Sequence, residues 1–242
     1  MMTKTPQVTG ESAVKDWYSS YYAKGGADRN NLRTNPGVLF QLLATESAVV
    51  RALRIAALDL ASAKILDVGC GGGGNTSQLL RLGAAIVNLT GIDIFPERLE
   101  EAKNIYPNAR WVCADARRMD FADAEFDLVT EFTMFATLPD DALCAGIAAE
   151  MCRVCKPGGY LLLVDWRTPK LRDPAYSALT RARLKRLFPL DGELELVRAY
   201  PGALVPPVGR FLSKYLPSVY FLVAALFPFL VGQKAYLLRR RA

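Results

Sequence analysis

The sequence contains no histidine among its 242 residues. Histidine is the side chain that most readily exchanges a proton near neutral pH, and it is the commonest metal ligand. Its absence excludes Ser-His and Cys-His nucleophile pairs, so any catalytic base must be Asp, Glu, Tyr, Lys or Cys. We also expect no metal site.

Cysteine is scarce, with five residues at positions 70, 113, 144, 152 and 155. An odd number scattered through expected strands, helices and one turn does not predict a disulfide framework. Cys152 and Cys155 form a CxxC pair, but no second pair or histidine completes four zinc ligands. We interpret both cysteines as core-facing residues.

The first ten residues lack an apolar core between a basic start and a cleavage site, so no secretory signal is expected and the protein is assigned to the cytoplasm. The formal net charge of +6 is unevenly distributed. Residues 1–60 carry +2, residues 61–165 carry −6 and residues 166–242 carry +10. The basic C-terminal third indicates an anionic partner or a solvated face.

From residue 63 onward, short apolar runs alternate with helical segments, which is typical of a parallel sheet covered on both faces. Helices are expected over 75–82, 96–105, 140–154 and 173–188, with Lys156–Gly159 as a helix stop and turn. The pattern predicts an α/β fold with a doubly wound, mostly parallel seven-stranded sheet. The expected strands are 64–68, 89–94, 110–114, 126–131, 159–165, 193–199 and 234–240.

One catalytic domain is expected over residues 61–242. Residues 1–60 form a helical N-terminal cap of the same domain, with an aromatic-rich helix over 12–24 and an amphipathic helix that begins at Pro36. Residues 200–233 are expected to be an insertion that forms a lid before the last strand.

A glycine-rich turn, Asp67–Asn75, follows the first expected strand. Ligands bind at the carboxyl ends of parallel strands, and glycines let a ligand approach the main chain closely. Gly69, Gly71 and Gly74 also match the dinucleotide-binding fingerprint. The turn alone therefore leaves two classes of cofactor open.

Three aspartates at the ends of successive strands separate these classes. Asp67 precedes the turn, where a carboxylate can bind an ammonium group but would repel a pyrophosphate. Asp93 can accept hydrogen bonds from both hydroxyls of a ribose. Both classes of cofactor require an acidic residue at this position. Asp115, with the adjacent backbone, can recognise the amino edge of an adenine, which a dinucleotide fold does not require.

With aspartates 26 and 22 residues apart beside one glycine turn, residues 64–166 resemble the class I S-adenosylmethionine-dependent methyltransferases. The resemblance implies their Rossmann-like methyltransferase fold, and S-adenosylmethionine as the cofactor. The motifs that carry it are ILDVGCGGGGNT (65–76), TGIDIFPERLEEAK (90–103), CADA (113–116), FDLVTEFTMF (126–135) and RVCKPGGYLLLVD (153–165).

By this resemblance, Asp67 and the glycine turn would hold the methionine moiety and Asp93 the ribose. Ile94 would lie against the adenine, whose amino group Asp115 would recognise. The residues that the resemblance assigns to the cofactor site are Asp67, Gly69, Gly71, Gly73, Asp93, Ile94, Asp115, Ala116, Glu131 and Phe132.

The reaction implied is methyl transfer to a small-molecule acceptor, expected to be an oxygen nucleophile, by in-line displacement that leaves S-adenosylhomocysteine. Positioning is expected to supply most of the rate enhancement. Without histidine, we hypothesise that Glu131 or Asp165 orients or deprotonates the nucleophile, with a phenol from Tyr21 or Tyr22 of the cap.

Three other functions are alternatives to the methylation of a small molecule. Nucleic-acid methylation is not expected, because Glu131–Met134 stands where such enzymes carry an Asn-Pro-Pro-Tyr type of motif. A non-catalytic module that binds the cofactor is an alternative. An oxidoreductase is the least favoured reading, and it would bind nicotinamide.

The uncharged segment Tyr215–Gln233 has 19 residues, about the length that crosses a bilayer. Pro217 and Pro228 argue against a transmembrane helix, as does the return of the chain as the last strand. A lid over the substrate pocket is expected, and the alternative is peripheral membrane contact by a methyltransferase of a lipid or quinone-like acceptor. The basic residues that would suit an anionic lipid or a phosphorylated substrate are Lys185, Arg186, Arg210, Lys214, Lys234 and 239–241.

Overall fold

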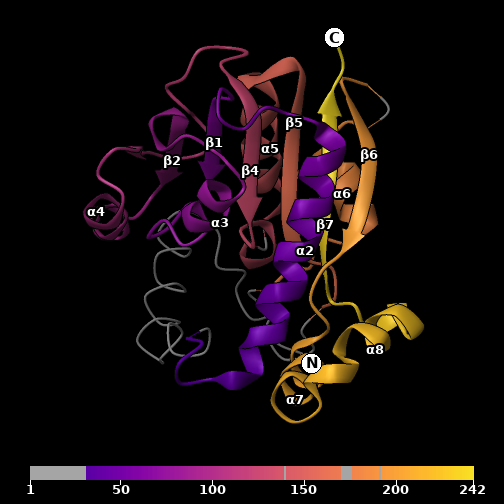
Figure 1. Ribbon diagram of the computed structural model, residues 1–242. Helices are drawn as coiled ribbons and strands as arrows, with labels where there is room; N and C mark the ends of the chain where they lie inside the picture. The colour runs from indigo at the N-terminus through magenta and orange to yellow at the C-terminus, as the bar shows by residue number, and fades with distance from the viewer. Residues whose placement is uncertain (1–30, 139, 170–175, 191) are drawn as a thin grey trace, which may run out of the picture.

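The computed structural model describes residues 31–138, 140–169, 176–190 and 192–242. The helix expected over 12–24, with Tyr21 and Tyr22, lies outside the described residues. In Figure 1, one sheet runs through the molecule, with α2 across one face and α5 and α6 on the other.

The sheet has seven strands in the order β3-β2-β1-β4-β5-β7-β6. Strands β1 to β5 are parallel, whereas β7 runs antiparallel to both β5 and β6. The expected doubly wound, mostly parallel sheet is confirmed. The strands are β1 Ile65–Val68, β2 Leu89–Asp93, β3 Arg110–Cys113, β4 Phe126–Phe132, β5 Cys155–Trp166, β6 Leu194–Pro201 and β7 Gln233–Arg240.

Local signals in the sequence explain where several helices begin. Pro96 occupies the first turn of α4, and Asp140 caps α5 by accepting hydrogen bonds from the backbone N–H groups of Ala142 and Leu143. The helices are η2 Pro36–Val38, α2 Leu39–Ala56, α3 Thr76–Arg81, η3 Ile86–Asn88, α4 Pro96–Ile105, η4 Phe135–Thr137, α5 Asp141–Val154, α6 Arg181–Leu187, α7 Pro206–Tyr215, η5 Pro217–Val219, α8 Tyr220–Leu226 and η6 Pro228–Leu230.

The prediction of a turn at Lys156–Gly159 is wrong, because these residues belong to β5. Cys155 pairs with Phe126 and Tyr160 pairs with Leu128. The segment of β5 between these two pairs is therefore longer than the segment of β4 that it faces. Gly158 adopts φ +79°, a backbone conformation that favours glycine. The glycines therefore form a bulge inside a strand and do not separate two elements.

The basic helix expected over 173–188 is shorter in the structure and begins at Arg181. Ahead of it, the N–H of Ser177 donates to the carbonyl of Ala136, and that of Leu179 donates to Trp166. These long-range bonds hold the chain in a non-helical path. Thr180 then starts the helix by accepting the N–H of Arg183.

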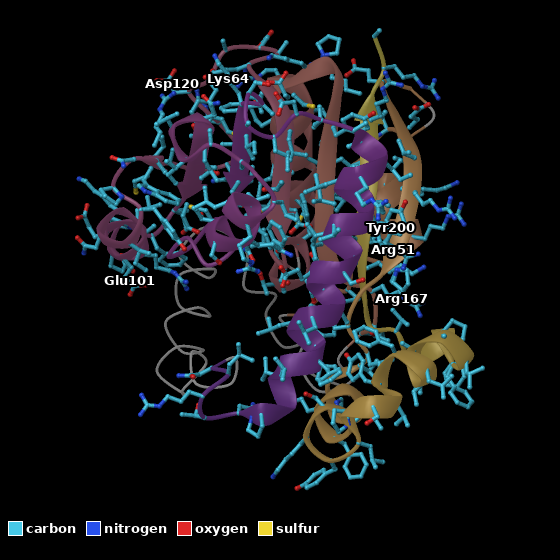
Figure 2. The ribbon with its side chains drawn as sticks, in the orientation of Figure 1. Arg51, Lys64, Glu101, Asp120, Arg167 and Tyr200 are labelled. Carbon is cyan, nitrogen blue, oxygen red and sulfur yellow. The ribbon has the colours of Figure 1, made fainter. Side chains whose placement is uncertain are left out.

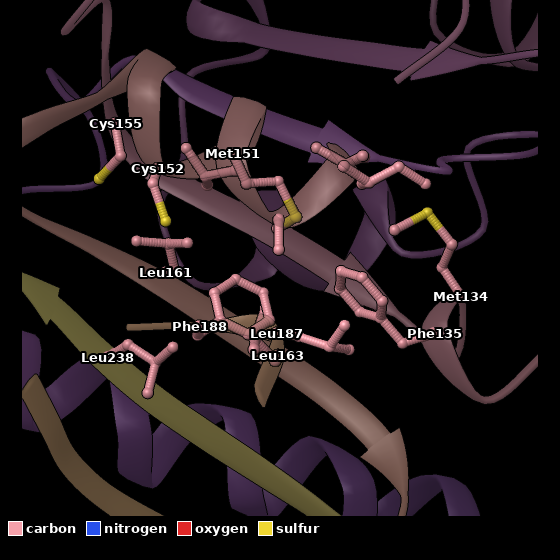
Figure 3. Close-up of a cluster of buried hydrophobic side chains, with 14 of the residues drawn as sticks. Met134, Phe135, Met151, Cys152, Cys155, Leu161, Leu163, Leu187, Phe188 and Leu238 are labelled. Atoms are coloured by element: carbon pink, nitrogen blue, oxygen red, sulfur yellow. The ribbon is translucent and has the colours of Figure 1, made fainter. Parts of the chain in front are cut away.

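Apolar side chains form a core on each face of the sheet. Figure 3 shows the core beneath α5 and α6, where Phe135 and Phe188 pack edge to face with ring centroids 5.6 Å apart. Cys152 and Cys155 lie in this core, as their interpretation as core-facing residues requires. Burial raises the pKa of both thiols to about 12, which leaves them unreactive near neutral pH.

The apolar segment from Tyr215 to Gln233 is not one helix. Pro217 and Pro228 open the short turns η5 and η6, with α8 between them. Within the described residues, no helix combines the length and apolar character needed to cross a membrane. Figure 1 shows α7 and α8 at the end of the molecule toward which the parallel strands point.

Candidate functional site

A cavity of about 890 Å³ lies at the carboxyl ends of the parallel strands. Its walls come from the glycine turn after β1, the ends of β2, β3 and β4, the first turns of α2, and α7. This is the position where an open parallel sheet binds its ligands.

Three glycines shape the turn at the floor of this cavity. Gly69, Gly71 and Gly73 have φ values of +70°, +53° and +74°, which other residues rarely adopt. The N–H of Gly71 donates to Oδ2 of Asp93 over 2.8 Å. The turn after β1 is thereby fastened to the end of β2.

Asp67 lies beneath the turn and is 1% exposed. Its Oδ1 accepts a hydrogen bond of 2.9 Å from Thr130 Oγ1, while its Oδ2 has no partner among the described residues. Burial raises the pKa of Asp67 to about 7, and the charge of Asp93 adds to this rise. Within the part of the chain that the structure describes, the residue does not line the cavity.

Asp93 and Ile94 line the cavity, as expected from the sequence. Oδ1 of Asp93 accepts the N–H of Phe95 over 3.0 Å, and Oδ2 accepts that of Gly71. Each carboxylate oxygen can accept a second hydrogen bond, so the side chain is able to receive a pair of hydroxyls. Burial raises the pKa of Asp93.

Asp115 and Ala116 also line the cavity. The guanidinium of Arg117 donates to both oxygens of Asp115, and the backbone N–H of Arg117 donates to one of them. These hydrogen bonds lower the pKa of Asp115 and hold it as a carboxylate acceptor.

Glu131 and Asp165, the expected catalytic carboxyls, are fully buried, and in the described structure neither lines the cavity. Glu131 accepts the N–H of Met134 over 3.0 Å, and Asp165 accepts the N–H of Ala136 over 2.8 Å. Burial raises the pKa of Glu131 well above its ordinary value, assisted by the charge of Asp165, and raises the pKa of Asp165 to about 7. Both carboxyls therefore hold the chain that follows β4.

That chain forms the cavity wall beside the glycine turn. Phe132, Thr133 and Met134 line the cavity, and Thr133 adopts φ +62°, which is unusual for a β-branched residue. A Cβ at Gly69 would lie 2.9 Å from Sδ of Met134, so a substitution there would displace the Met134 side chain in addition to straining the backbone. Sequence reasoning did not identify Thr133.

A second polar group lies on the other side of the cavity. Oγ1 of Thr45 and Oε1 of Gln233 are hydrogen-bonded at 2.5 Å, and Nε2 of Gln41 donates to the carbonyl of Leu204. Arg210 lines the same region, and its Nε is buried without a hydrogen-bond partner in the described chain. Since β2 and β7 are four strands apart, roughly 19 Å separates this group from Asp93.

The sequence singled out Arg210 of this group, as a basic residue that would suit an anionic lipid or a phosphorylated substrate, but it did not predict the other residues, although a signal for two of them was available. Gln41 and Thr45 stand four residues apart in an amphipathic helix, so they share a face. That face is the covered one, as the 7% exposure of Gln41 shows. Two polar residues on the buried face of an amphipathic helix therefore indicate a functional site next to that face.

Sequence similarity to known proteins is concentrated in the part of the chain that forms β1 to β4 and the start of β5. Residues 65–159 match the family described as "Methyltransferase domain". A 2-methyl-6-phytyl-1,4-hydroquinone methyltransferase of Synechocystis is 38% identical over 105 residues, which cover 42% of this chain and 31% of that protein. A ubiquinone biosynthesis O-methyltransferase of Xanthomonas oryzae is 38% identical over 121 residues, which cover 47% of this chain and 48% of the relative. The chain therefore spans about half or less of these two relatives.

Similarity of fold extends further than similarity of sequence. The crystal structure of a SAM-dependent methyltransferase from Methanosarcina mazei superposes with a TM-score of 0.56 at 18% identity, over 78% of this chain and 96% of that one. Sheet order, glycine turn and strand-end aspartates agree with the sequence match. Residues 65–159 of this chain therefore belong to the class I S-adenosylmethionine-dependent methyltransferases.

Proposed function

We propose that this protein transfers a methyl group from S-adenosylmethionine to a small-molecule acceptor, through an oxygen nucleophile, and releases S-adenosylhomocysteine. The observation that carries the proposal is the convergence of the glycine turn, Asp93 and Asp115 on one half of a single cavity. The other half, with Arg210 and its neighbours, has room for an acceptor.

The described residues fit this cofactor. Gly69, Gly71 and Gly73 form a turn in left-handed backbone conformations, where Cβ atoms would lie 2.8–3.2 Å from neighbouring side chains. The unpartnered Oδ2 of Asp67 beneath this turn supports the assignment of the cofactor's cationic end to the turn. Asp93 would hold the ribose. Ile94, Asp115 and Ala116 would surround the adenine, with Phe132 toward the reacting methyl.

The cofactor supplies an electrophilic methyl on a sulfonium, which needs no activation by the protein. The protein has to place an acceptor oxygen in line with that methyl and exclude water. We assign Glu131 and Asp165 to this positioning, because their hydrogen bonds to Met134 and Ala136 fix the wall that begins at Thr133.

The position of Arg210 in the cavity favours a methyl acceptor whose hydroxyl group is acidic. A guanidinium remains charged at all relevant pH values, and a positive charge nearby lowers the pKa of a bound hydroxyl. A phenolic or hydroquinone hydroxyl could thus release its proton to bulk water as the acceptor binds, so that it enters the cavity as a phenolate without a histidine base. The two curated relatives named above are hydroquinone and ubiquinone-pathway methyltransferases, which agrees with this class of acceptor.

Calorimetric titration of S-adenosylmethionine tests the proposal. The wild-type protein is expected to bind it, and Asp93→Ala to bind about 10²- to 10⁴-fold more weakly, since two charge-assisted hydrogen bonds are lost. Asp120→Ala is the matched control, because Asp120 is exposed at the opposite end of the domain (Figure 2). No binding by the wild-type protein would refute the proposal.

A further inference from the structure

A large apolar surface lies beside the cavity, on the segment from α7 to η6. Its members are large side chains that are 44–68% exposed, and together we call them the C-terminal apolar surface: Phe211, Tyr215, Leu216, Phe221, Leu222, Leu226, Phe227 and Phe229. Eight such side chains, each about half exposed, present on the order of 800 Å² of apolar area. The largest patch on a typical soluble monomer is roughly 300–600 Å².

The surface is displayed on a firmly attached scaffold. Tyr220 of α8 is fully buried, and its hydroxyl accepts the N–H of Leu204 over 3.1 Å. The guanidinium of Arg167 donates to the carbonyls of Val231 and Pro228, which fastens η6 to the end of the sheet. Each helix thus buries one face in the domain and turns the other outward.

The exposed face of α7 carries a cation among its aromatic rings. Phe211, Lys214 and Tyr215 follow helical spacing, and the Lys214 ammonium lies 4.8 Å from the centre of the Tyr215 ring. Such an arrangement lets the lysine stem cover apolar area while the ammonium reaches polar surroundings. The first turns of the same helix line the cavity through Pro206, Pro207 and Arg210.

Charge decides which partner covers this surface. The chain has no Asp or Glu from residue 196 to its end, while Arg210 and Lys214 stand within α7. A second copy of the chain would bring like charges together in a twofold interface. An anionic bilayer offers hydrocarbon for the aromatic and leucine side chains and negative headgroups for the cations.

We propose that the C-terminal apolar surface docks the protein on the surface of an anionic membrane, with the cavity beside the acyl-headgroup boundary. The basic residues 239–241 take no part, because β7 ends at the opposite end of the molecule (Figure 1). The inference concerns where the protein resides while it acts. It does not depend on the proposed reaction.

Co-sedimentation with vesicles tests this proposal. The wild-type protein is expected to bind vesicles of phosphatidylcholine with phosphatidylglycerol about tenfold more strongly than vesicles of phosphatidylcholine alone, and added salt should weaken the difference. The triple variant Phe221→Ser, Leu222→Ser, Leu226→Ser should lose binding by about tenfold or more, because these side chains are 48%, 57% and 64% exposed. Since the Phe221 ring also contacts Phe40 and Tyr220, thermal unfolding is used to check that the variant is folded. Lys214→Glu should weaken binding to the anionic vesicles alone.

The double variant Val87→Ser, Ile105→Ser is the matched control, since these residues are 73% and 62% exposed and lie outside the surface. It should bind vesicles as the wild type does. Absence of vesicle binding by the wild type, or equal binding by the triple variant, would overturn the proposal. So would a wild-type dimer in sedimentation equilibrium that the triple variant abolishes. Titration of S-adenosylmethionine in solution separates this result from any failure of the proposed function.

Discussion

Thr130 Oγ1 donates a 2.9 Å hydrogen bond to one oxygen of the Asp67 carboxyl, and the other oxygen has no partner in the described structure. The carboxyl is enclosed by β1 and β4 directly beneath the glycine turn. A buried carboxylate with one hydrogen bond is costly, so the group favours its protonated form.

The stability of the cofactor-free protein should therefore depend on the ionisation of Asp67. Its pKa rises from an ordinary value of 3.8 to about 7 on folding, so the folded state binds more protons between these values. The stabilising contribution is complete below about pH 4 and is lost as the pH rises through 7. A shift of this size corresponds to a change on the order of 4 kcal/mol in the free energy of unfolding.

Asp67→Asn should remove this dependence while keeping the acceptor for Thr130. Urea unfolding between pH 4 and pH 8 would then show the variant gaining stability relative to the wild type as the pH rises. Asp120→Asn, at an exposed position, should follow the wild-type curve. Parallel curves for Asp67→Asn and the wild type would contradict the assignment.

Gly73→Ala should destabilise the protein by about 1–3 kcal/mol. The φ of +74° disfavours any side chain, and a Cβ there would lie 3.2 Å from the Trp111 ring and 3.3 Å from Ala102. Gly74→Ala is the matched control, since a Cβ at that position meets no atom within 4 Å. Thermal unfolding of both variants measures the difference, and equal melting temperatures would count against the turn geometry.

Glu131→Gln should lower kcat by less than about tenfold. Glutamine keeps an acceptor for the N–H of Met134, and burial raises the pKa of the carboxyl that it replaces. A general base contributes about 10²- to 10⁴-fold, so a loss of that size would show that Glu131 removes the acceptor proton. The rate is measured with hydroquinone and catechol acceptors at saturating S-adenosylmethionine.

Arg210→Gln should raise KM for an acidic acceptor by about 10- to 100-fold, the equivalent of one charge-assisted hydrogen bond. The affinity for S-adenosylmethionine should not change, because Arg210 lies on the acceptor half of the cavity. Arg51→Gln controls for the loss of a cation, since Arg51 packs over the Tyr200 ring outside the cavity (Figure 2). An unchanged KM in Arg210→Gln would remove Arg210 from acceptor binding.

The half of the cavity that we assign to the cofactor could be predicted from the sequence, because its residues are local to strand ends. Asp93 and Asp115 each follow an apolar run directly, and parallel strands bring their carboxyl ends to one edge. Gly69, Gly71 and Gly73 were identified for the same reason, and all three adopt left-handed backbone conformations.

The acceptor half depends on long-range packing that periodicity does not encode. Thr45 and Gln233 meet although 188 positions separate them in the chain. The bulge at Gly158 was mistaken for a turn because glycine is permissive in both settings, and only the register between β4 and β5 distinguishes them. The start of α6 was misplaced because the hydrogen bonds of Ser177 and Leu179 reach distant carbonyls.

The final antiparallel strand has a consequence for how this fold can vary. β6 and β7 pair along their length, and a hydrogen bond from Gly202 N–H to the Gln233 carbonyl closes the gap between them. The intervening residues 203–232 leave and re-enter the sheet at neighbouring points. Their apolar face and cavity wall could therefore be exchanged for those of another protein without altering the pairing of the seven strands of the sheet. Acceptor choice and docking would then change together, while the cofactor half stayed intact.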